Sequence, residues 1–527
     1  MMVNKKLQVW LPLIFSIVLI AGMYLGYGLG GGTGFFKTHK ATSLQQAVDI
    51  IRRNYVDKVN LDSLQGDAMQ EMMTHLDPHS VYFPPVDLKE AKEELAGNFE
   101  GIGVEFNVFA DTVNIVYVIP NGPSDKAGLQ IGDKIIKVND YIIAGKPMSA
   151  DSIKKYIRGE KGSKVILQLQ RGKELKSVTV TRGSIPVPSV DAAYMIDKTT
   201  GYIKLNKFTS TSYEEFMRAL ENLKSQGLQK LIYDLRGNGG GYMDEAINMA
   251  DEFLSGDKLI VYTQGENKPK VEHRSRRPGL FEEGNLVLLV DELSASASEV
   301  VSGALQDWDR ATIIGRRTFG KGLVQEQFEL EDGSAIRLTI ARYYTPLGRS
   351  IQRPYDKGKK VYMDEIWERY SNGEALYADS NKVSNGKQFR TPGGKIVYGG
   401  GGIMPNIFVP IDTATYPHSL NRVLLDGTFN NFVYRYYLRH KSQVDTYTSA
   451  SEYIQKFNHL EEMWNEFMDF VVKYSVNPGN FSEQQKQSLK RRLEAYLARF
   501  KWRSNGFYQV LNEDDAMMKK ALEVISH

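Results

Sequence analysis

Residues 286–290 constrain the fold of this chain most strongly. They read Leu-Val-Leu-Leu-Val and contain no polar side chain. A strand that is apolar on both faces belongs to a sheet that is covered on both sides, which is typical of parallel α/β sheets. A serine-rich turn, residues 294–299, follows at once and leads into a helical pattern over 298–307. The stretch therefore predicts a strand, a turn and a helix at the centre of an α/β domain.

The segments around this stretch alternate in the same way. Strand patterns and helical patterns follow one another from residue 201 to residue 343, as expected when helices cover a central sheet. We predict strands at 201–206, 230–236, 311–315 and 336–343, and helices at 212–226 and 243–254. A chain of 527 residues is too long for a single hydrophobic core, so further domains are expected on either side.

The N-terminal segment favours export from the cytoplasm. Lys5 and Lys6 precede a stretch, 7–36, that has no charged residue. Its most apolar part, 9–29, is long enough to cross a hydrocarbon core of about 30 Å, and the lysines favour a cytoplasmic N-terminus. We predict an uncleaved transmembrane signal anchor. A cleaved signal peptide and a buried helix are the alternatives, although no clear A-x-A cleavage site follows.

Composition excludes several classes of function. The net charge of +3 is small for a chain of this length and supports no nucleic-acid partner. There is no cysteine, which excludes disulfides and thiol catalysis. The eight histidines show no HExxH spacing. We therefore predict neither a metal nor any other cofactor.

The pattern along the chain predicts five parts. Residues 1–37 hold the cytoplasmic stub, the anchor and a glycine-rich linker, and 38–95 form a helical segment that ends in a turn around His79. For His79 we prefer a role in positioning this segment over a catalytic role. The remaining parts are a small β-rich domain at 96–185, an α/β core at 186–415 with a polar, glycine-rich insertion at about 353–400, and a helical region at 416–527.

The β-rich domain resembles a PDZ domain. A glycine pair enters a strand at Gly101, Ile102, Gly103 and Val104, and the run Ala-Gly-Leu-x-x-Gly-Asp follows at 127–133. PDZ domains bind an extended C-terminal peptide as an added strand and hold its carboxylate on backbone N–H groups. By this resemblance the carboxylate loop comprises those four residues. A plain small β-barrel is the alternative.

The central stretch carries the groups that nucleophilic catalysis requires. Three serines alternate at Ser294, Ser296 and Ser298, and Lys321 follows between two glycines. A serine hydroxyl needs a partner that takes its proton, and a lysine serves when burial lowers the pKa of its ammonium group. Gln325 is placed to orient that amine. Backbone N–H groups at residue 297 and in the glycine-rich loop 239–241 are candidate donors to an oxyanion.

These motifs resemble the C-terminal processing peptidases (tail-specific proteases) of serine peptidase family S41. The resemblance covers about residues 40–415 and rests on Leu-Asp-Pro-His-Ser at 76–80, the PDZ-like run, Asp-Leu-Arg-x-Asn-x-Gly-Gly at 234–241, Ser-Ala-Ser-Ala-Ser-Glu at 294–299, Thr-Phe-Gly-Lys-Gly at 318–322 and Tyr-Thr-Pro-x-Gly-Arg-Ser-Ile at 344–351. It implies Ser296 as nucleophile, Lys321 as general base and acid, and Gln325 as the residue that orients Lys321. The insertion and the C-terminal helices depart from the family pattern.

The resemblance also implies roles outside the dyad. Ala297 and Gly241 would supply the oxyanion N–H groups, with Gly240 as second choice. Ser294, Ser298 and Asp307 would be structural, the last through bonds to nearby backbone. Arg158 would couple peptide binding in the PDZ domain to activation.

The sequence thus predicts a multidomain α/β (α+β) protein. It would have an S41/crotonase-like protease core, an inserted PDZ domain, helical regions at both ends and a transmembrane helix. The predicted activity is that of a serine endopeptidase that binds apolar C-terminal tails and forms an acyl-enzyme. The predicted location is the bacterial cell envelope, anchored in the inner membrane with the body in the periplasm. Protein substrates are the expected partners, with a homo-oligomer or an adaptor as further partners. The alternatives are an inactive PDZ scaffold and a crotonase-like acyl-transfer enzyme.

Overall fold

The structure is a computed structural model that describes residues 5–29, 42–377, 386–412, 427–473 and 481–526. The chain forms two compact units, Met1–Met72 and Met73–His527. The first holds the helices α1 (Lys5–Leu29) and α2 (Ser43–Asn54) and most of α3 (Leu61–Thr74). The Thr42 hydroxyl accepts the N–H of Gln45, and the Gln45 amide accepts the N–H of Thr42, so a capping box begins α2.

The transmembrane anchor predicted over 9–29 is not confirmed. The segment is helical as part of α1, with described side chains at positions 10–25. Among the described residues, no helix has both the length and the apolar content that crossing a membrane requires.

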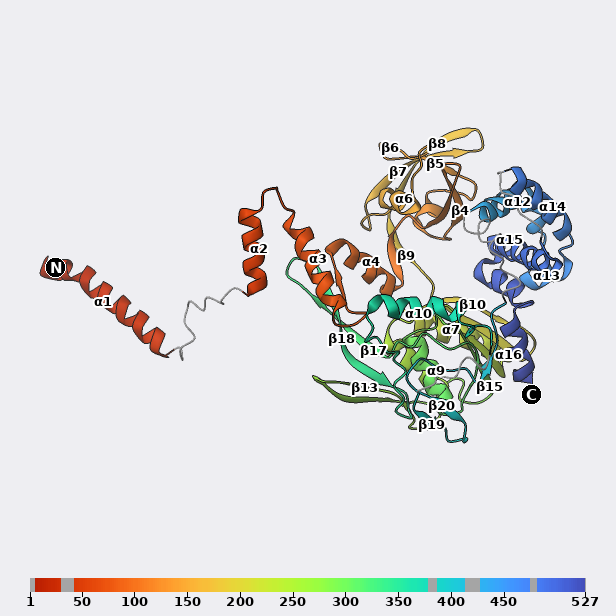
Figure 1. Cartoon of the computed structure of the whole chain (residues 1–527). Coiled ribbons are helices and arrows are strands. Elements are labelled where there is room, and N and C mark those ends of the chain that lie inside the picture. Colours follow the sequence, from red (N-terminus) through yellow and green to blue (C-terminus); the bar gives the residue numbers. More distant parts are fainter. Residues whose placement is uncertain (1–4, 30–41, 378–385, 413–426, 474–480, 527) are drawn as a thin grey trace. The chain divides into compact units, whose positions relative to one another are not determined.

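The second unit begins with a short segment that leads into the PDZ-like domain. Strand β1 (Val81–Phe83) and helix α4 (Pro85–Ala96) come first. The domain's sheet has the order β3-β4-β5-β7-β8, and its core contains Ile115, Ile135 and Leu167. The elements of this domain (Figure 1) are β3 (Val104–Phe109), β4 (Thr112–Val118), α5 (Pro123–Lys126), β5 (Lys134–Val138), β6 (Tyr141–Ile142), α6 (Ala150–Ile157), β7 (Lys164–Arg171) and β8 (Glu174–Thr181). Outside this sheet, β2 (Asn98–Gly101) pairs with β9 (Gly183–Pro186), so the entry and exit of the domain lie side by side.

A six-stranded sheet forms the α/β core, in the order β10-β11-β12-β15-β16-β21. All neighbours pair in parallel except β10 and β11. The strands are β10 (Val190–Met195), β11 (Thr200–Leu205), β12 (Lys230–Asp234), β15 (Asn285–Val290), β16 (Thr312–Gly315) and β21 (Ile407–Phe408). Strand β21 follows the insertion in sequence, so the chain returns from the insertion to complete the sheet.

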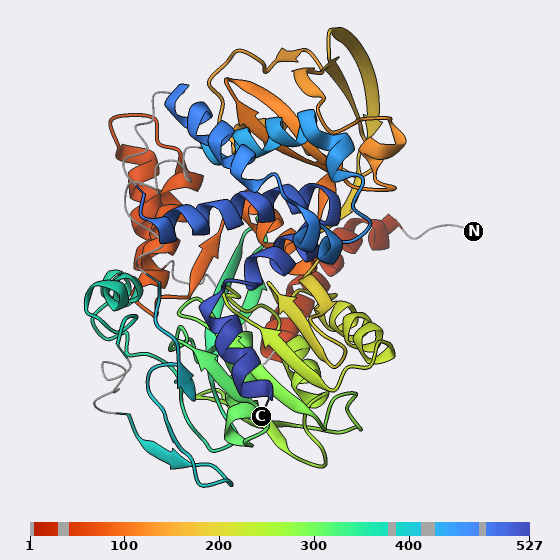
Figure 2. The same cartoon turned by 90° about the vertical axis from the view of Figure 1, so that its right-hand side faces the viewer.

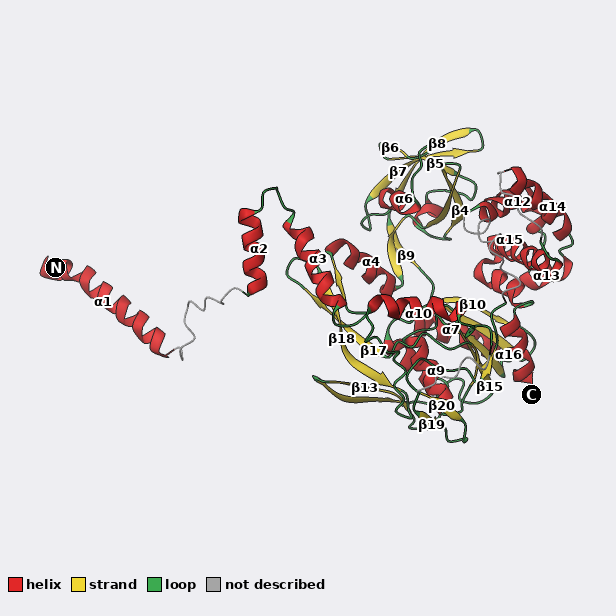
Figure 3. Ribbon diagram, in the orientation of Figure 1, coloured by secondary structure: helices red, strands yellow, loops and turns green. Residues whose placement is uncertain are grey.

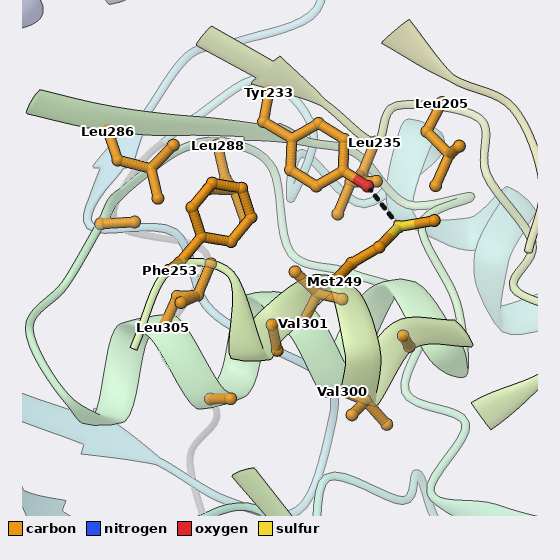
Figure 4. Packing of buried hydrophobic residues seen from close by; sticks show 14 of the residues in the cluster. Leu205, Tyr233, Leu235, Met249, Phe253, Leu286, Leu288, Val300, Val301 and Leu305 are labelled. Atoms are coloured by element: carbon orange, nitrogen blue, oxygen red, sulfur yellow. Dashed lines mark hydrogen bonds between the residues drawn. The ribbon is translucent and has the colours of Figure 1, made fainter. Parts of the chain in front are cut away.

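Strand β15 is buried on both faces, as its apolar sequence predicts. Leu286, Leu288 and Val290 pack against the helices α7 (Ser212–Ser225), α8 (Met243–Asp251) and α9 (Ala297–Asp307). Figure 4 shows this side of the core, including the hydrogen bond from the Tyr233 hydroxyl to the Met249 sulfur at 3.2 Å. Val287 and Leu289 point to the other face, which the C-terminal helix α16 (Ala516–Ser526) covers (Figure 2).

A second sheet lies beside the core and carries part of the site. Its order is β1-β18-β13-β14. Strands β1 and β13 pair with one edge of β18, and β17 pairs with its other edge. These strands are β13 (Leu259–Gly265), β14 (Lys268–Arg274), β17 (Leu323–Glu329) and β18 (Ala335–Tyr344). Strand β17 starts two residues after Lys321 and contains Gln325, so strand geometry fixes the relation between these two residues.

Regular elements lie within the insertion predicted at about 353–400. They are helix α10 (Lys359–Ser371) and the hairpin of β19 (Gln388–Arg390) and β20 (Ile396–Tyr398) (Figure 3). The C-terminal region is helical, as predicted, and has its own aromatic core around Phe432, Tyr453 and Phe467. Its helices are α12 (Thr428–Val444), α13 (Ala450–Lys456), α14 (Leu460–Lys473) and α15 (Glu483–Asn512), followed by α16.

The C-terminal helices contact the PDZ-like domain through Arg503. This residue interrupts α15 with a φ of 54°. Its guanidinium lies 3.4 Å from the centre of the Tyr117 ring and pairs with Glu105 on β3. A non-glycine residue with positive φ is strained, and the contacts to Tyr117 and Glu105 offset that strain.

Candidate active site

Ser296 occupies a strained turn between β15 and α9. Its φ is 54° and its ψ is −113°, a region that costs a non-glycine residue about 1–3 kcal/mol. Close packing holds it there, because a Cβ atom at Gly240 would lie 2.8 Å from the Ser296 Cβ. Sharp strand-to-helix turns of this kind present nucleophilic serines in other hydrolase folds.

The structure distinguishes the three serines. The Ser294 hydroxyl donates to the Leu235 carbonyl at 2.9 Å, and the Ser298 hydroxyl donates to the Asn238 carbonyl at 2.8 Å. Both serines are fully buried and hold the glycine-rich loop against α9. Ser296 is the one of the three that lines a cavity of about 1000 Å³. Bonding therefore gives Ser294 and Ser298 structural roles, as predicted.

Lys321 lines the same cavity and has the surroundings of a proton acceptor. Its Nζ donates to Gln325 Oε1 at 2.9 Å. Burial, together with the positive charge of Arg337, lowers the pKa of the ammonium group to about 8. Among the described residues no carboxylate forms an ion pair with Lys321. The amine therefore loses its proton more readily than an ordinary lysine.

The turn around His79 holds Gln325 through the main chain. Gln325 Nε2 donates to the His79 carbonyl, and Asp77 Oδ1 accepts the N–H of His79 at 2.8 Å. The imidazole lies outside the cavity lining: its Nε2 is 3.0 Å from the Tyr362 hydroxyl, and burial lowers its pKa to about 3. His79 is thus a positioning residue, and the N-terminal segment contributes to the orientation of Lys321.

Glu299 joins the loops that carry Ser296 and Lys321, a contact that sequence reasoning missed. Its fully buried carboxylate accepts the N–H of Ser296 at 2.9 Å and that of Lys321 at 2.8 Å. It also accepts the N–H of Gly320 at 2.7 Å and the Thr318 hydroxyl at 2.5 Å. Burial raises the pKa of this carboxyl group against these donors. A glutamate three residues after the helix-capping serine, as in a capping box, was the signal available in the sequence.

Two backbone N–H groups remain open beside Ser296. Within the described part of the chain, neither the Ala297 nor the Gly241 N–H donates to a protein acceptor. Gly240 differs, because its N–H donates to Asn238 Oδ1 at 2.9 Å. Gly241 has a φ of 147°, and a Cβ atom there would lie 2.0 Å from the Phe208 carbonyl oxygen. The geometry therefore favours Gly241 over Gly240 as an oxyanion donor.

The insertion reaches the loop that precedes Lys321. Arg369 on α10 is almost fully buried and donates to the carbonyls of Arg317 at 3.1 Å and Thr318 at 2.9 Å. A third, longer bond of 3.4 Å goes to the Phe319 carbonyl. The Arg353 guanidinium lies 4.3 Å from the centre of the Phe319 ring. Arg353 and Arg369 of the insertion therefore hold the loop at residues 317–319, which precedes Lys321.

Asp307 is structural, as predicted. Its Oδ2 accepts the N–H of Leu347 at 3.0 Å, and its Oδ1 pairs with Arg349 at 2.5 Å. Both members of this ion pair are fully buried. A buried charge needs such a partner, and the pair fixes the segment after β18.

The predicted peptide loop lies apart from the catalytic cavity. Residues 101–104 do not line that cavity. The carbonyls of Ile102 and Gly103 accept the N–H groups of Ser124 and Ile119, at 2.9 and 3.0 Å. Within the described residues, the N–H groups of Ile102 and Gly103 themselves have no protein acceptor. That arrangement suits the binding of a peptide carboxylate.

Arg158 links the PDZ-like domain to the wall of the cavity. Its guanidinium lies 4.6 Å from the centre of the Phe99 ring and 3.7 Å from a carboxylate oxygen of Glu93 on α4. The next residues of α4, Glu94, Leu95 and Ala96, line the cavity. A contact path therefore runs from Arg158 to the catalytic cavity.

Comparison with known proteins identifies the family of this chain. A model of peptidase family S41 matches residues 199–358, and a PDZ model matches 101–181. A probable CtpA-like serine protease of Staphylococcus epidermidis is 32% identical over 341 residues, which are 64% of this chain and 69% of that protein. The chain belongs to peptidase family S41. It is a CtpA-like serine peptidase with a PDZ domain, so the predicted family and enzyme class are confirmed.

Three further similarities of this S41 peptidase are recorded. A probable CtpA-like serine protease of Staphylococcus aureus (strain MRSA252) is 33% identical over 362 residues, 68% of this chain and 70% of that protein. The solved photosystem II D1 C-terminal processing protease is 29% identical, with a TM-score of 0.33, and the match covers 58% of this chain and 89% of that one. Residues 419–503 match a family of unknown function, DUF8443.

Proposed function

We propose that this S41 peptidase is an endopeptidase that cleaves polypeptides through a dyad of Ser296 and Lys321. One observation carries the proposal. Ser296, Lys321, Ala297 and Gly241 line one cavity, and the lysine amine is bonded to Gln325 and to no carboxylate among the described residues. That environment lets Lys321 exist as a free amine near neutral pH.

The geometry supports a two-step acyl transfer. Neutral Lys321 takes the proton of the Ser296 hydroxyl as the oxygen attacks the scissile carbonyl carbon. The N–H groups of Ala297 and Gly241 stabilise the tetrahedral oxyanion. When the intermediate collapses, the C–N bond breaks, and Lys321 returns the proton to the leaving amine. An acyl group then remains on Ser296, and Lys321 activates the water that hydrolyses it.

Single substitutions test the dyad. Ser296→Ala and Lys321→Ala should each abolish cleavage of an unfolded substrate with an apolar C-terminus, while circular dichroism and the melting temperature show a folded protein. Lys519→Ala, which changes an exposed lysine on α16, is the matched control and should keep full activity. Wild-type rates in Lys321→Ala would refute the dyad.

We propose further that the PDZ domain selects substrates by their C-terminal tails. The support is the loop at residues 101–104, where two N–H groups are open to a carboxylate. Cleavage of a tailed peptide should exceed cleavage of the same peptide with an amidated C-terminus, and an unlabelled tail peptide should compete. Equal rates for the acid and the amide, together with no competition, would refute tail recognition.

The catalytic arrangement disfavours both alternative functions. An inactive PDZ scaffold would not need a buried lysine amine that a glutamine orients. A crotonase-like acyl-transfer enzyme has no use for a tail-binding domain. Mass spectrometry of peptide products separates the three functions, since only the peptidase generates new C-termini that Ser296→Ala lacks.

The location remains a proposal from the sequence. The uncharged stretch 7–36, preceded by Lys5 and Lys6, supports a body outside the cytoplasm. Protease accessibility in intact spheroplasts tests it: digestion from outside is expected, and full protection with an intact membrane would refute it.

A further inference from the structure

Among the described residues, the catalytic cavity contains one cation that has no ion pair and that the proposed reaction does not use. The charged side chains in its lining are Lys92, Glu94, Lys207, Lys321, Glu326 and Arg337. Lys92 pairs with Glu329, Lys207 pairs with Glu94, and Lys268 pairs with Glu326 at 3.2 Å. Two of the six therefore remain without an ion pair among the described residues. One is the proposed base, Lys321, and the other is Arg337.

Strand β18 directs Arg337 toward the reacting groups. Arg337 lies on β18, the strand that also carries Tyr343. The Tyr343 hydroxyl lies 2.7 Å from the Lys321 carbonyl and 3.2 Å from the Ser296 carbonyl. Both Arg337 and Tyr343 line the cavity. Arg337 thus belongs to the wall along which a bound polypeptide passes the dyad.

The contacts of Arg337 hold it in place but do not neutralise it. Its guanidinium lies 4.7 Å from the centre of the Phe83 ring on β1. One nitrogen donates to Gln327 Oε1 at a long 3.3 Å. The nearby carboxylate of Glu94 is bound by Lys207. A guanidinium carries five N–H donors, so most of its hydrogen-bonding capacity is left for another acceptor.

A half-buried guanidinium without an ion pair destabilises the folded state unless a binding partner supplies an acceptor for its charge. Its planar fork of donors matches a carboxylate, which it binds with two parallel hydrogen bonds. Its charge also discourages a proton on Lys321. A carboxylate that arrives with the substrate would accept the unused N–H donors of Arg337.

We propose that Arg337 is a substrate-binding residue that pairs with a carboxylate of the bound polypeptide beside the scissile bond. This rests on the proposed peptidase function and adds a specificity to it. Two sources supply the group: an Asp or Glu side chain near the cleaved bond, or the α-carboxylate of a short tail. Both present the same chemistry, and peptide design separates them.

The experiment compares four versions of one cleaved peptide. They carry either Asp or Asn at one position near the scissile bond and end in either a free acid or an amide. The set of four is made for each of the three positions on either side of that bond. The enzyme is the full-length wild type, Arg337→Gln, Arg337→Lys and Arg342→Gln. Arg342 is an exposed arginine on the same strand, bonded to the Tyr355 hydroxyl and absent from the cavity lining, so it is the matched control. The measurement is kcat/KM for each combination of enzyme and peptide.

We expect the wild type to favour the carboxylate over its amide in one arm by about tenfold or more, which corresponds to about 1.4 kcal/mol, because an arginine binds a carboxylate through two charge-assisted hydrogen bonds. Arg337→Gln should reduce the Asp/Asn ratio to about one, or the acid/amide ratio to the part that the PDZ domain supplies. Arg337→Lys should keep part of the Arg337 contribution, and Arg342→Gln should keep all of it. The PDZ contribution to the acid/amide ratio is common to all four enzymes and cancels between them.

Three outcomes would overturn the proposal. The first is a wild-type ratio near one in both arms while the peptides are still cleaved. The second is an Arg337→Gln enzyme that keeps the wild-type ratio. The third is a change in its pH profile alone, which would assign Arg337 only to the pKa of Lys321. If Arg337→Gln is inactive, affinities of Ser296→Ala and Ser296→Ala/Arg337→Gln for the Asp and Asn peptides decide by the same ratios. Failure of every enzyme to cleave any peptide would instead refute the proposed peptidase function.

Discussion

Replacing Gln325 with glutamate tests how the structure sets the protonation of Lys321. The Oε1 atom of Gln325 lies 2.9 Å from the lysine Nζ. A carboxylate at that distance favours the ammonium form, and opposite charges this close raise a lysine pKa by about 1–3 units. The pKa of Lys321 would then move from about 8 to between about 9 and 11.

The size of the effect follows from the fraction of neutral lysine. With a pKa of about 8, roughly a tenth of Lys321 is neutral at pH 7. In Gln325→Glu that fraction falls to between roughly a hundredth and a ten-thousandth. Activity at pH 7 should therefore fall by about ten- to a thousandfold and recover as the pH rises through the new pKa. The lost bond from Gln325 Nε2 to the His79 carbonyl adds a loss that does not depend on pH.

The assay is kcat/KM for one apolar-tailed peptide between pH 6 and pH 11. The acid limb of the wild type should have its midpoint near pH 8, and that of Gln325→Glu at least about one unit higher. Gln264→Glu, on the exposed part of β13, adds the same charge elsewhere and should keep the wild-type midpoint. An unchanged midpoint in Gln325→Glu would show that Gln325 does not contact the amine in the active enzyme.

Three further substitutions follow from the site. Lys321→Met should raise the free energy of unfolding at pH 7 by about 1–3 kcal/mol, because the folded state holds an ammonium group at a lowered pKa. The wild type binds fewer protons when folded between pH 8 and pH 10.5, so its own stability rises with pH there and the gain should vanish above that range in denaturant titrations; a constant gain would contradict the linkage. Glu299→Gln replaces one carboxylate oxygen with an NH2 group and so leaves two of the four donors unsatisfied. Because each unsatisfied donor costs about 1–3 kcal/mol, the free energy of unfolding should fall by about 2–6 kcal/mol, with loss of activity. Full activity would contradict the role of Glu299. Arg369→Met should lower kcat by tenfold or more with little change in KM, as about 3 kcal/mol of loop-holding bonds are lost, whereas Arg390→Met, an exposed arginine of the same insertion, should change neither; equal kcat values for the two variants would show that α10 does not position the loop.

Local patterns were sufficient for the central elements of the fold. The alternation of Leu286, Val287 and Leu288 between the two apolar layers follows from the two-residue period of a strand, which the sequence displays directly. The motif around Ser296 and its spacing to Lys321 likewise singled out residues that line one cavity. The helix inside the insertion was not predicted, because α10 has a weak apolar period and its Arg369 is buried against the loop before Lys321.

The amino-acid sequence by itself determined the family, the core strands and the residues proposed for the dyad, because each depends on neighbours within a few positions or on a family motif. The tertiary structure alone decided which groups surround that dyad. The His79 carbonyl accepts a hydrogen bond from the side-chain amide of Gln325, which lies 246 positions later in the chain. Arg369 donates to the Thr318 carbonyl, which lies 51 positions earlier. Likewise, whether Arg337 is paired depends on how Lys207 and Glu94, from distant segments, meet. Hydrogen bonds and charges act across space, and only the packed chain determines which of them are satisfied.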